Sequence, residues 1–462
     1  MKKTNIRPGH DQGESTGMPV VNPDAAGIDI GSEEHYVAVP EGRDPQPVRR
    51  FKCYTSDLQR MAEWLKSCGI KTVAMESTGV YWIPAYEVLE KAGLEVLLVD
   101  AHHVKSVSGR KSDVSDSRWI QQLHSFGLLS GAFRPSDEIA RLRAYWRQRG
   151  GLVESCARQI HLMQKALEQM NVQLHKAVTD ITGVTGMAII RKIVAGERDP
   201  HALATLRHAS VQRTEAEIAE ALNGNYRPEH LFALRQALTG FDFFQGLIEE
   251  CDRETEAYMA TLRSKTPADE EPPRKRKRSR RKNQPHFDLT AELHRITGVD
   301  LTQVEGIDAL TAQTFITECG LDMSAFPTEK RFASWLGVCP NNRKTGGRIR
   351  SRHTRRVANR TAKALRIAAQ TLLRSKSALG AFVRRIRSRS GAAIAITAGA
   401  HKLARILYRL LKYGEAYVSE GLKEYEARQQ QTTLRSLQRR ASALGLALVD
   451  TTTGALLEGG VS

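Results

Sequence analysis

The spacing of apolar residues changes near residue 135, and this change limits the folds that the chain can adopt. Between residues 25 and 129, short apolar runs alternate with segments of helical periodicity. The runs predict strands over 25–30, 35–40, 48–53, 71–77 and 94–100. The other segments predict helices over 56–68, 80–92 and 112–129, with Ser56 as an N-cap residue. Three early strands followed by strand–helix alternation predict an α/β domain with a mixed sheet.

After residue 135 the periodicity is helical. Apolar positions over 137–179, 214–222 and 228–262 predict long helices joined by turns, in a helical hairpin or coiled-coil insert. A plain helical core is the alternative. The fold class is therefore α/β plus α. The predicted segments are a disordered leader (1–23), the α/β domain (24–134), a helical or coiled-coil domain (135–265), a basic linker (266–286), a helical C-terminal domain (287–421) and a polar tail (422–462).

Composition narrows the class of protein. The chain has 462 residues, of which 41% are hydrophobic and 26% charged, as in folded globular proteins. It holds no run near the ~20 apolar residues that a membrane span needs, and the polar first 23 residues lack the apolar core of a signal peptide. Six cysteines lie far apart without a CxxC pair, which predicts neither a zinc site nor a disulfide framework. We expect a reduced, cytosolic protein.

Positive charge is concentrated in the C-terminal half. The formal net charge is +18, yet residues 24–130 hold 15 acidic and 12 basic residues. Residues 331–414 hold 21 Lys and Arg and no Asp or Glu. A stretch of one sign repels itself unless an anion compensates, and polyphosphate does so because binding releases counterions. This favours a nucleic-acid partner over an anionic membrane surface. The run at 274–282 fits a solvated linker as well as a nucleic-acid contact.

Four acidic residues lie at the ends of predicted elements in the α/β domain. Asp29 and Glu76 end strands, and Asp113 and Asp116 begin a helix at i and i+3, on one face. If they converge at one edge of the sheet, they would repel each other unless they held hard cations, and Mg²⁺ takes oxygen ligands. Two such ions ~4 Å apart would clamp the attacking and leaving oxygens of a phosphodiester. The order of strands and acids is typical of the ribonuclease-H-like fold.

Each acid also has an ordinary interpretation. Asp113 and Asp116 would favour a helix N-terminus in any protein. Asp29 could belong to a turn, and Glu76 could be a surface residue at a strand end. The interpretation as a metal site rests on the set rather than on any single residue.

A glycine pair in the acid-free stretch indicates a phosphate site. Gly346 and Gly347 permit close backbone approach and unusual backbone angles. Basic residues that surround this turn could stabilise charge developing on phosphate: Arg343, Lys344, Arg348, Arg350 and Arg352, followed by Arg355 and Arg356. The preceding VEGIDALTAQTFITECG resembles a helix-hairpin-helix, whose amides can hold a phosphate. A glycine turn between core helices is the alternative.

Two separate segments resemble one family. GIDIG, MESTGVYW and GRKSDVSDS, in this order, resemble the DEDD-type transposases of the IS one-ten insertion-sequence family, described as bridge-RNA-guided recombinases. FASWLGVCPNNRKTGGRIRSRHTRRVANRTAKALRIAA, through AITAGAHKLARILYRLLKYG, resembles the second domain of this family. The resemblance covers roughly residues 25–420. It implies a RuvC-like N-terminal domain, a coiled-coil insert and a helical transposase domain, with the acids of the family at Asp29, Glu76, Asp113 and Asp116.

The resemblance also implies partners. A structured guide RNA would pair with donor and target DNA, and the protein would act as a homo-oligomer, a dimer or tetramer, in the bacterial cytosol or nucleoid. Catalytic sites would join the acidic domain of one subunit to the C-terminal domain of another. Basic charge by itself does not distinguish RNA from DNA, so the RNA partner rests on the resemblance.

The nucleophile departs from the family pattern. The family usually presents a serine before Gly-Gly or Ala-Gly, and this chain has Thr345 there. Threonine keeps the hydroxyl, although its β-methyl stiffens χ1 and crowds the oxygen. An activated Thr345 would form a phosphothreonine link. Alternatively, Thr345 is a turn residue that binds a DNA phosphate, and Ser351 and Ser334 are the nearest other hydroxyls.

These features predict a Mg²⁺-dependent DNA recombinase of an insertion sequence. It would conserve bond energy in a covalent link, and the sequence holds no P-loop for ATP. One alternative is a metal-dependent nuclease resembling Holliday-junction resolvases, with water as nucleophile. Another is a non-catalytic nucleic-acid-binding protein with structural acids.

Overall fold

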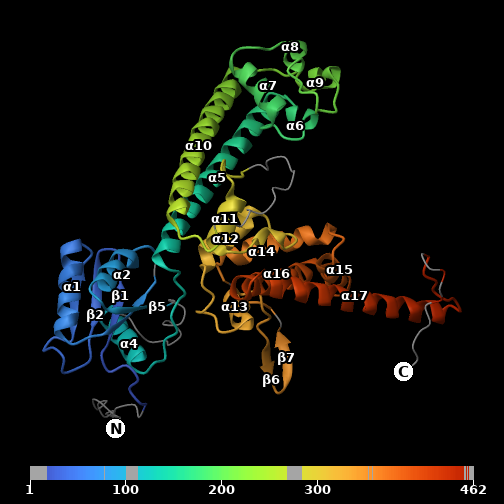
Figure 1. Cartoon of the computed structure of the whole chain (residues 1–462). Helices are drawn as coiled ribbons and strands as arrows, with labels where there is room; N and C mark the ends of the chain where they lie inside the picture. The colour runs from blue at the N-terminus through green and yellow to red at the C-terminus, as the bar shows by residue number, and fades with distance from the viewer. Residues whose placement is uncertain are drawn as a thin grey trace, which may run out of the picture. The chain divides into compact units, whose positions relative to one another are not determined.

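A computed structural model describes residues 18–77, 79–99, 113–267, 283–351, 353–355, 357–451, 454 and 456 (Figure 1). It does not describe the side chains of residues 113, 114, 343, 344, 349, 415–426, 428 and 429. Most of the predicted leader and of the predicted basic linker therefore lies outside the described residues. The chain divides into two compact units, residues 1–134 and residues 135–462, which we describe separately.

Unit 1 is built on a five-stranded mixed sheet. The strands are β1 (Ala25–Ile30), β2 (Glu34–Ala38), β3 (Val48–Lys52), β4 (Thr72–Glu76) and β5 (Glu95–Val99). Their order in the sheet is β3-β2-β1-β4-β5. The first three strands pair antiparallel, whereas β1, β4 and β5 run parallel. The sheet fits the ribonuclease-H-like α/β domain expected from the sequence.

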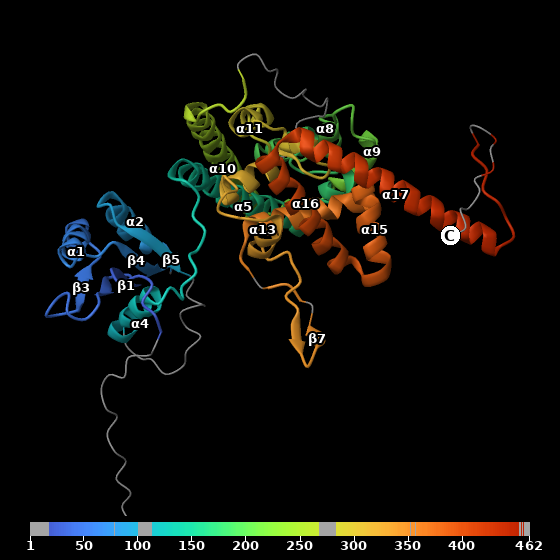
Figure 2. The ribbon, with the colours of Figure 1, turned by 60° about the horizontal axis from the view of Figure 1, so that its bottom comes forward.

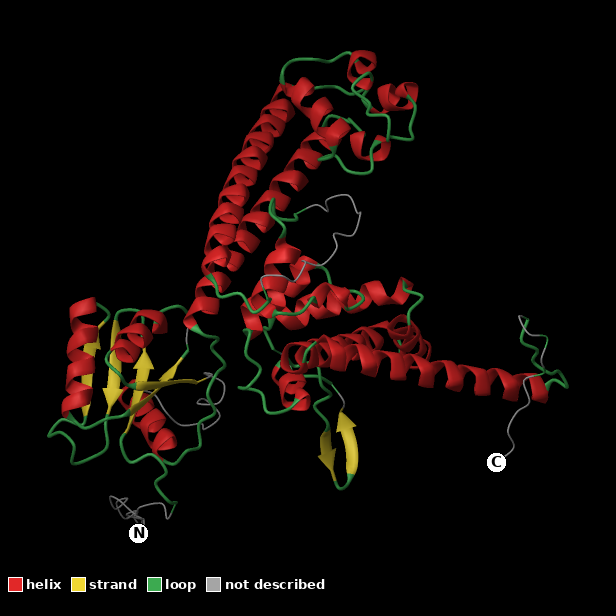
Figure 3. Ribbon diagram, in the orientation of Figure 1, coloured by secondary structure: helices red, strands yellow, loops and turns green. Residues whose placement is uncertain are grey.

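Helices cover both faces of this sheet (Figure 3). The helices α1 (Thr55–Ser67) and α2 (Trp82–Lys91) bury their apolar faces with Ile28, Val37 and Met75 on one face. The helix α4 (Asp113–Ser125) packs on the other face, where Ile120 joins Ala74 in a smaller buried cluster. The elements match the predicted ones in type and order, and only their ends differ.

Of the helix ends in unit 1 that differ from the prediction, the start of α1 and the end of α4 have identifiable causes. Helix α1 begins at Thr55 after Tyr54, which makes no side-chain cap hydrogen bond, so Ser56 lies inside the helix instead of capping it. Helix α4 ends at Ser125 rather than at Leu129. Gly127 follows with a φ of 66°, a left-handed conformation that ends helices and that glycine adopts at little cost.

The insert in unit 2 consists mainly of two long helices, α5 (Asp137–Gln169) and α10 (Pro228–Thr261). They run antiparallel, because Tyr258 Oη donates to the Glu138 carbonyl at 3.0 Å, while Gln245 Nε2 donates to Cys156 Sγ at 3.3 Å. This is the helical hairpin of the first interpretation. The expected helix over 137–179 is shorter, ending at Gln169.

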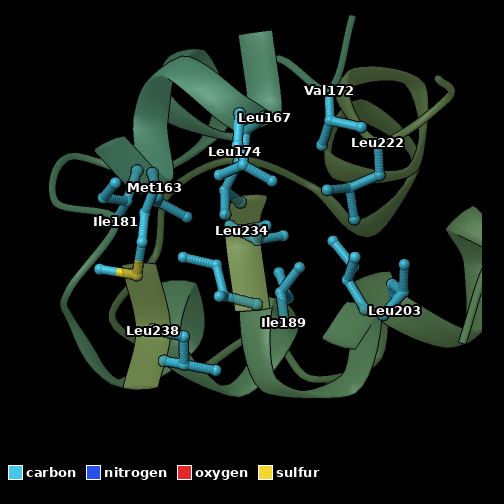
Figure 4. Close-up of a cluster of buried hydrophobic side chains, with 14 of the residues drawn as sticks. Met163, Leu167, Val172, Leu174, Ile181, Ile189, Leu203, Leu222, Leu234 and Leu238 are labelled. Carbon is cyan, nitrogen blue, oxygen red and sulfur yellow. The ribbon is translucent and has the colours of Figure 1, made fainter. Parts of the chain in front are cut away.

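Four short helices join the far ends of α5 and α10: α6 (Leu174–Ala177), α7 (Val184–Val194), α8 (Pro200–Ala204) and α9 (Glu215–Ala221). Apolar side chains from these helices and from both long helices form one buried core (Figure 4). Met163, Leu174, Ile189 and Leu234 are fully buried in it. The end of the insert is therefore a small folded module rather than a simple loop.

The C-terminal part of unit 2 packs around one central helix. Its elements are α11 (Leu289–Thr297), η1 (Leu301–Gln303), α12 (Ala309–Cys319), α13 (Glu329–Trp335), β6 (Arg343–Thr345), β7 (Arg348–Ser351), α14 (Arg360–Thr371), η2 (Leu372–Arg374), α15 (Ala378–Ser390), α16 (Ala392–Tyr413) and α17 (Glu415–Ala443). Helix α16 contacts α13, α14, α15 and α17. Helix α17 crosses the predicted boundary at residue 421, so part of the predicted polar tail is helical.

The insert is attached to this part through α12. Arg143 Nε on α5 donates to the Thr317 carbonyl at 2.9 Å, and Arg147 Nε donates to Glu318 Oε1, also at 2.9 Å. Within the described residues, no helix combines the length and hydropathy that crossing a membrane requires. None of the six cysteines, all of which lie among the described residues, forms a disulfide.

Candidate active site

Asp29 and Glu76 lie next to each other at the carboxyl ends of two parallel strands. β1 and β4 pair with Ile28 opposite Met75, so the next residue of each strand is Asp29 and Glu76. Paired residues of neighbouring strands point to the same face of a sheet. Both carboxylates therefore start from adjacent positions on one face, as the sequence predicted from the strand ends.

A close approach between α4 and β1 identifies this face. A Cβ atom on Gly27 would lie 2.2 Å from the Gln121 nitrogen and 2.5 Å from the Ser117 oxygen. Only glycine allows a helix backbone to approach a strand this closely. Gln121 Nε2 also donates to the Ala25 carbonyl, at 3.4 Å. Since Gln121 contacts the start of β1 and Ser117 its middle, α4 runs antiparallel to the strand.

Contacts with β4 give the same direction. Thr72 Oγ1 lies 2.9 Å from His124 Nε2, and Ala74, two residues further, shares a buried cluster with Ile120. Two strand residues span about 6.6 Å and four helix residues about 6 Å. Moving two residues forward along β4 from Ala74 reaches Glu76, and moving four residues back along α4 from Ile120 reaches Asp116. The register thus places Asp116 opposite the end of β4.

The corresponding step along β1 leads to Asp113. Gly27 and Ser117 are in contact, and moving two residues along β1 and four residues back along α4 gives Asp29 and Asp113. Asp113 is the first residue of α4, and its side chain lies outside the described residues. The backbone positions of all four predicted acids therefore converge at one edge of the sheet.

The donor set at this edge fits a hard divalent cation. Glu76 is only 6% exposed, and Asp29 and Asp116 are half-buried. Among the described side chains, however, no group of three or more His, Cys, Asp or Glu is arranged to hold a metal ion. The side chain of Asp113, the fourth acid, lies outside this described set. The carboxylate oxygens are of the type that Mg²⁺ prefers, and metal binding itself stays a prediction.

Sequence analysis missed one residue at this edge. Tyr36 on β2 is paired with Asp29 in the antiparallel β1–β2 ladder, so its half-buried ring starts on the same face as the carboxylates. The alternation of HYVAVP contained the signal, because Val37 points to the opposite face with the α1–α2 core. The register across the hairpin was needed to place Tyr36 next to Asp29.

Thr345 ends the first strand of a two-stranded hairpin that the predicted all-helical domain did not include. It pairs with Arg348 across Gly346 and Gly347, whose φ angles are 56° and 75°. Positive φ at both central residues is the feature of a two-residue type I′ hairpin turn. Figures 1 and 2 show the hairpin extending away from the helices of unit 2. The Thr345 side chain is exposed, and a Cβ on either glycine would meet open space.

The predicted basic residues divide into three groups. Arg348 and Arg350 are exposed on β7. Arg355 Nη2 donates to the Ser334 carbonyl at 2.6 Å, so this guanidinium also anchors the base of the hairpin to α13. The other four lie outside the description, as whole residues or as side chains: Arg343, Lys344, Arg352 and Arg356.

The two other candidate hydroxyls, of Ser334 and Ser351, differ from that of Thr345 in position or in exposure. Ser334 is exposed on α13, away from the glycine turn. Ser351 is half-buried, and its Oγ accepts from the His353 backbone nitrogen at 3.4 Å. Of these three hydroxyls, only that of Thr345 lies at the turn itself.

The helix-hairpin-helix segment is an interior turn. A Cβ on Gly306 would lie 3.2 Å from the Ala368 oxygen and from a methyl carbon of Leu372, so the turn packs against the end of α14. The carboxylate of Asp308 caps α12 by accepting from the Thr311 backbone nitrogen at 2.9 Å. A carboxylate already occupies the anion-binding end of this helix. The structure favours the alternative, a glycine turn between core helices.

Glu329 neutralises part of the positive charge of the acid-free stretch. The sequence analysis did not identify this residue. It precedes the stretch by two residues, and both Arg405 and Arg409 on α16 form ion pairs with it. Burial acts to raise the pKa of Glu329, but hydrogen bonds from Arg409 and Arg405 hold it below its usual value. Lys402, also on α16, has a lowered pKa because it is partly buried beside the same two arginines.

Comparison with known families gives two matches. A family model described as a transposase, of the DEDD type of IS110 elements, matches residues 26–172. A second model, described as transposase of the IS116/IS110/IS902 family, matches residues 300–384. The first match contains all four acids, and the second contains the hairpin with Thr345. No curated protein matches the chain.

Proposed function

Because this chain belongs to the IS110 family of transposases, we propose that it recombines DNA of an insertion sequence through a covalent bond between Thr345 and DNA. The observation that carries this proposal is the exposed Thr345 hydroxyl beside the Gly346–Gly347 turn. An exposed hydroxyl on an open hairpin can meet a phosphodiester without a steric barrier from its own domain. The flanking guanidinium groups of Arg348 and Arg350 supply positive charge for the phosphate.

The proposed step conserves the number of phosphodiester bonds. The Thr345 oxygen attacks phosphorus and forms a threonine–phosphate ester, while the bond from phosphorus to one deoxyribose oxygen breaks. The leaving oxygen takes up a proton, and the proton of the threonine hydroxyl is released to a base. Attack on the same phosphorus by a deoxyribose hydroxyl of another DNA strand reverses these changes and releases Thr345. No ATP is consumed.

The acidic edge of unit 1 is proposed to orient the DNA phosphate. Asp29, Glu76, Asp113 and Asp116 would hold Mg²⁺, which when bound neutralises phosphate charge. Glu76 is the most buried of the described acids at this edge, so it is positioned rigidly by the sheet. Tyr36 would limit the space on the β2 side of Asp29.

The family resemblance supports three further parts of the proposal. A structured guide RNA would pair with donor and target DNA. The protein would act as a dimer or tetramer, so that the acidic edge of one subunit serves the hairpin of another. The site of action would be the bacterial cytosol or nucleoid, where DNA is accessible.

Covalent trapping tests the proposal. The protein is purified with RNA transcribed from its flanking DNA and mixed with Mg²⁺ and a nicked target duplex, and adducts are mapped by mass spectrometry. We expect a DNA adduct on Thr345, retained in Thr345→Ser and absent from Thr345→Ala. Asp29→Ala should lose the adduct while keeping DNA binding.

Two other outcomes would replace the proposal. Metal-dependent strand cleavage without an adduct, unchanged in Thr345→Ala, would identify a hydrolytic nuclease with a phosphate-binding turn at Thr345. DNA binding without any cleavage in Mg²⁺ or Mn²⁺ would identify a binding protein with structural acids. Purification without a specific RNA would refute the guide-RNA part alone.

A further inference from the structure

The last long helix, α17, changes character along its length. Its first half, residues 415–426, contains four glutamates, at 415, 420, 424 and 426. We call residues 427–443 the distal half of α17. From residue 427 to residue 449 the chain contains four arginines and no Asp or Glu. This second acid-free stretch lies beyond both segments that the family models match.

The distal half of α17 is largely exposed. Helix α17 contacts α15 and α16, but most described side chains of its distal half are exposed, and only Leu434, Gln438 and Ala441 are half-buried. Figures 1 and 3 show the helix continuing past the other helices of the C-terminal part. A helix that packs so little against the rest of the protein is only marginally stable in water. A partner along it would add the missing stabilisation.

The arginine pair and the half-buried apolar residues lie on different faces of this half. Arg435 and Arg439 are four residues apart and therefore share one face, about 6 Å from each other along the axis. Arg440 points about 100° further round the helix and lies beside the exposed Leu437. Leu434 and Ala441, seven residues apart, share a different face, which is the half-buried one. The exposed arginines of this region thus form a one-signed surface.

We propose that the basic face of the distal half of α17 binds the phosphate backbone of duplex DNA. DNA carries one negative charge per ~1.7 Å of its axis, and arginine pairs with phosphate through two parallel N–H groups. Exposed Gln431, four residues before Arg435, and exposed Ser442, three residues after Arg439, add to this face hydrogen-bonding groups of the kind that contact phosphates. The inference rests on the proposed function in that DNA is the substrate.

Composition favours a duplex over single-stranded RNA. Residues 427–449 contain no Phe, Tyr or Trp, the side chains on which unpaired bases stack. A regular helix with a basic face fits the major groove of B-DNA, whereas the major groove of an RNA duplex is too narrow. The contact would be independent of sequence and sensitive to salt.

The salt dependence of binding tests this proposal. The variant Arg435→Gln/Arg439→Gln/Arg440→Gln keeps helix propensity and removes three charges. Affinity of the full chain for a 30-base-pair duplex of random sequence is measured from 50 to 200 mM salt. The slope of log K against log salt is negative, and each lost phosphate contact should lower its magnitude by about 0.9, so we expect this magnitude to decrease by about 2 to 2.7.

A matched control separates local contact from net charge. Arg60→Gln/Arg213→Gln/Arg227→Gln also removes three charges from the formal +18, but each of these arginines is exposed and paired with a carboxylate. This control should keep the wild-type slope. Equal slopes for the wild type and the α17 variant would overturn the proposal, as would equal decreases in the two variants.

Two further readouts assign the partner. A decrease seen with a 30-nucleotide single-stranded RNA but not with the duplex would overturn the choice of DNA. A lower molar mass in light scattering, with an unchanged slope, would identify α17 as a contact between copies of the chain. The Thr345 adduct, measured at low salt and saturating protein, reports on the proposed function separately from α17.

Discussion

Thr72 on β4 and His124 on α4 are joined by a hydrogen bond of 2.9 Å between Oγ1 and Nε2, which sets the register of α4 against the sheet. From this contact, each step of two residues along β4 matches four residues back along α4. The step passes Ala74 and Ile120 and reaches Glu76 and Asp116. The acidic edge of unit 1 therefore depends on a contact at the opposite end of the same helix.

Gly27→Ala should disturb this register. A Cβ at this position meets backbone atoms of α4 at 2.2 and 2.5 Å, and backbone cannot rotate away as a side chain can. We expect a loss of about 2–3 kcal/mol in the free energy of unfolding, at the upper end of overpacking effects. Metal-dependent DNA cleavage should fall with it, because Asp113 and Asp116 move with α4.

The control for Gly27→Ala is Gly150→Ala in α5. A Cβ on Gly150 would meet nothing within 4 Å. Alanine should therefore stabilise the helix by about 0.5–1 kcal/mol. Urea denaturation measures the free energy of unfolding of both variants. Equal changes in this free energy would mean that α4 does not approach β1 tightly.

Gly346→Val should impair strand transfer without unfolding the protein. The φ of 56° at this position is strained for valine by about 1–2 kcal/mol, whereas Asn followed by Gly suits a type I′ turn. Gly346→Asn is thus the matched control and should keep activity. Because the turn is exposed and packs against nothing, it can open to release this strain while the helices stay folded. We therefore expect melting temperatures close to that of the wild type for both variants, and loss of the Thr345 adduct in Gly346→Val only.

Gln313→Met should raise stability. Gln313 is fully buried in α12, and neither its Nε2 nor its Oε1 has a hydrogen-bond partner among the described residues. An unsatisfied buried polar group costs about 1–3 kcal/mol, which a methionine of similar shape avoids. Gln121→Met should have the opposite effect, because Gln121 Nε2 donates to Ser125 Oγ at 2.8 Å. The melting temperatures of the two variants, compared with that of the wild type, show whether each substitution stabilises or destabilises the protein.

A buried ion pair in the insert should show strong coupling. Arg149 and Asp252 have side chains only 5% and 3% exposed, and Arg149 Nη2 also donates to the Asn283 carbonyl at 3.0 Å. Removing either partner leaves an unpaired buried charge, which costs about 3–5 kcal/mol. The double variant Arg149→Met/Asp252→Leu should recover most of this loss. Additive single effects in a double-mutant cycle would contradict the prediction.

Unit 1 should lose stability as the pH falls below about 6.5. Burial lowers the pKa of both His35 and His124. Because the unfolded chain then binds protons that the folded chain does not, stability decreases below the unfolded pKa of about 6.5 and levels off below the folded pKa. Each histidine contributes at most about 1.4 kcal/mol per pH unit.

Replacement of the histidines tests this pH dependence. His35→Leu/His124→Gln should flatten the decrease in unfolding free energy between pH 6.5 and pH 5. Urea titrations at several pH values measure it. A wild-type dependence in the double variant would assign the acid sensitivity to other groups.

Local patterns were sufficient to predict the elements of unit 1 and the long helices of the insert. Alternation marks a strand and 3.6-residue spacing a helix, whatever surrounds them, so AAGIDI and KTVAMES could be assigned directly. The hairpin at Thr345 was missed because its turn depends on two glycines with positive φ rather than on an apolar pattern. The end of α4 was misplaced for the same reason, at Gly127.

The amino-acid sequence by itself determined which residues can perform chemistry: four acids at element ends, a hydroxyl before two glycines, and 84 residues without a negative charge. Only the tertiary structure decided that the acids share one edge, because strand register and helix direction depend on contacts between residues far apart in the chain. Gly27 against Ser117 and Thr72 against His124 are such contacts. For the same reason, packing against α14 made the Gly306 turn part of the core rather than a phosphate site.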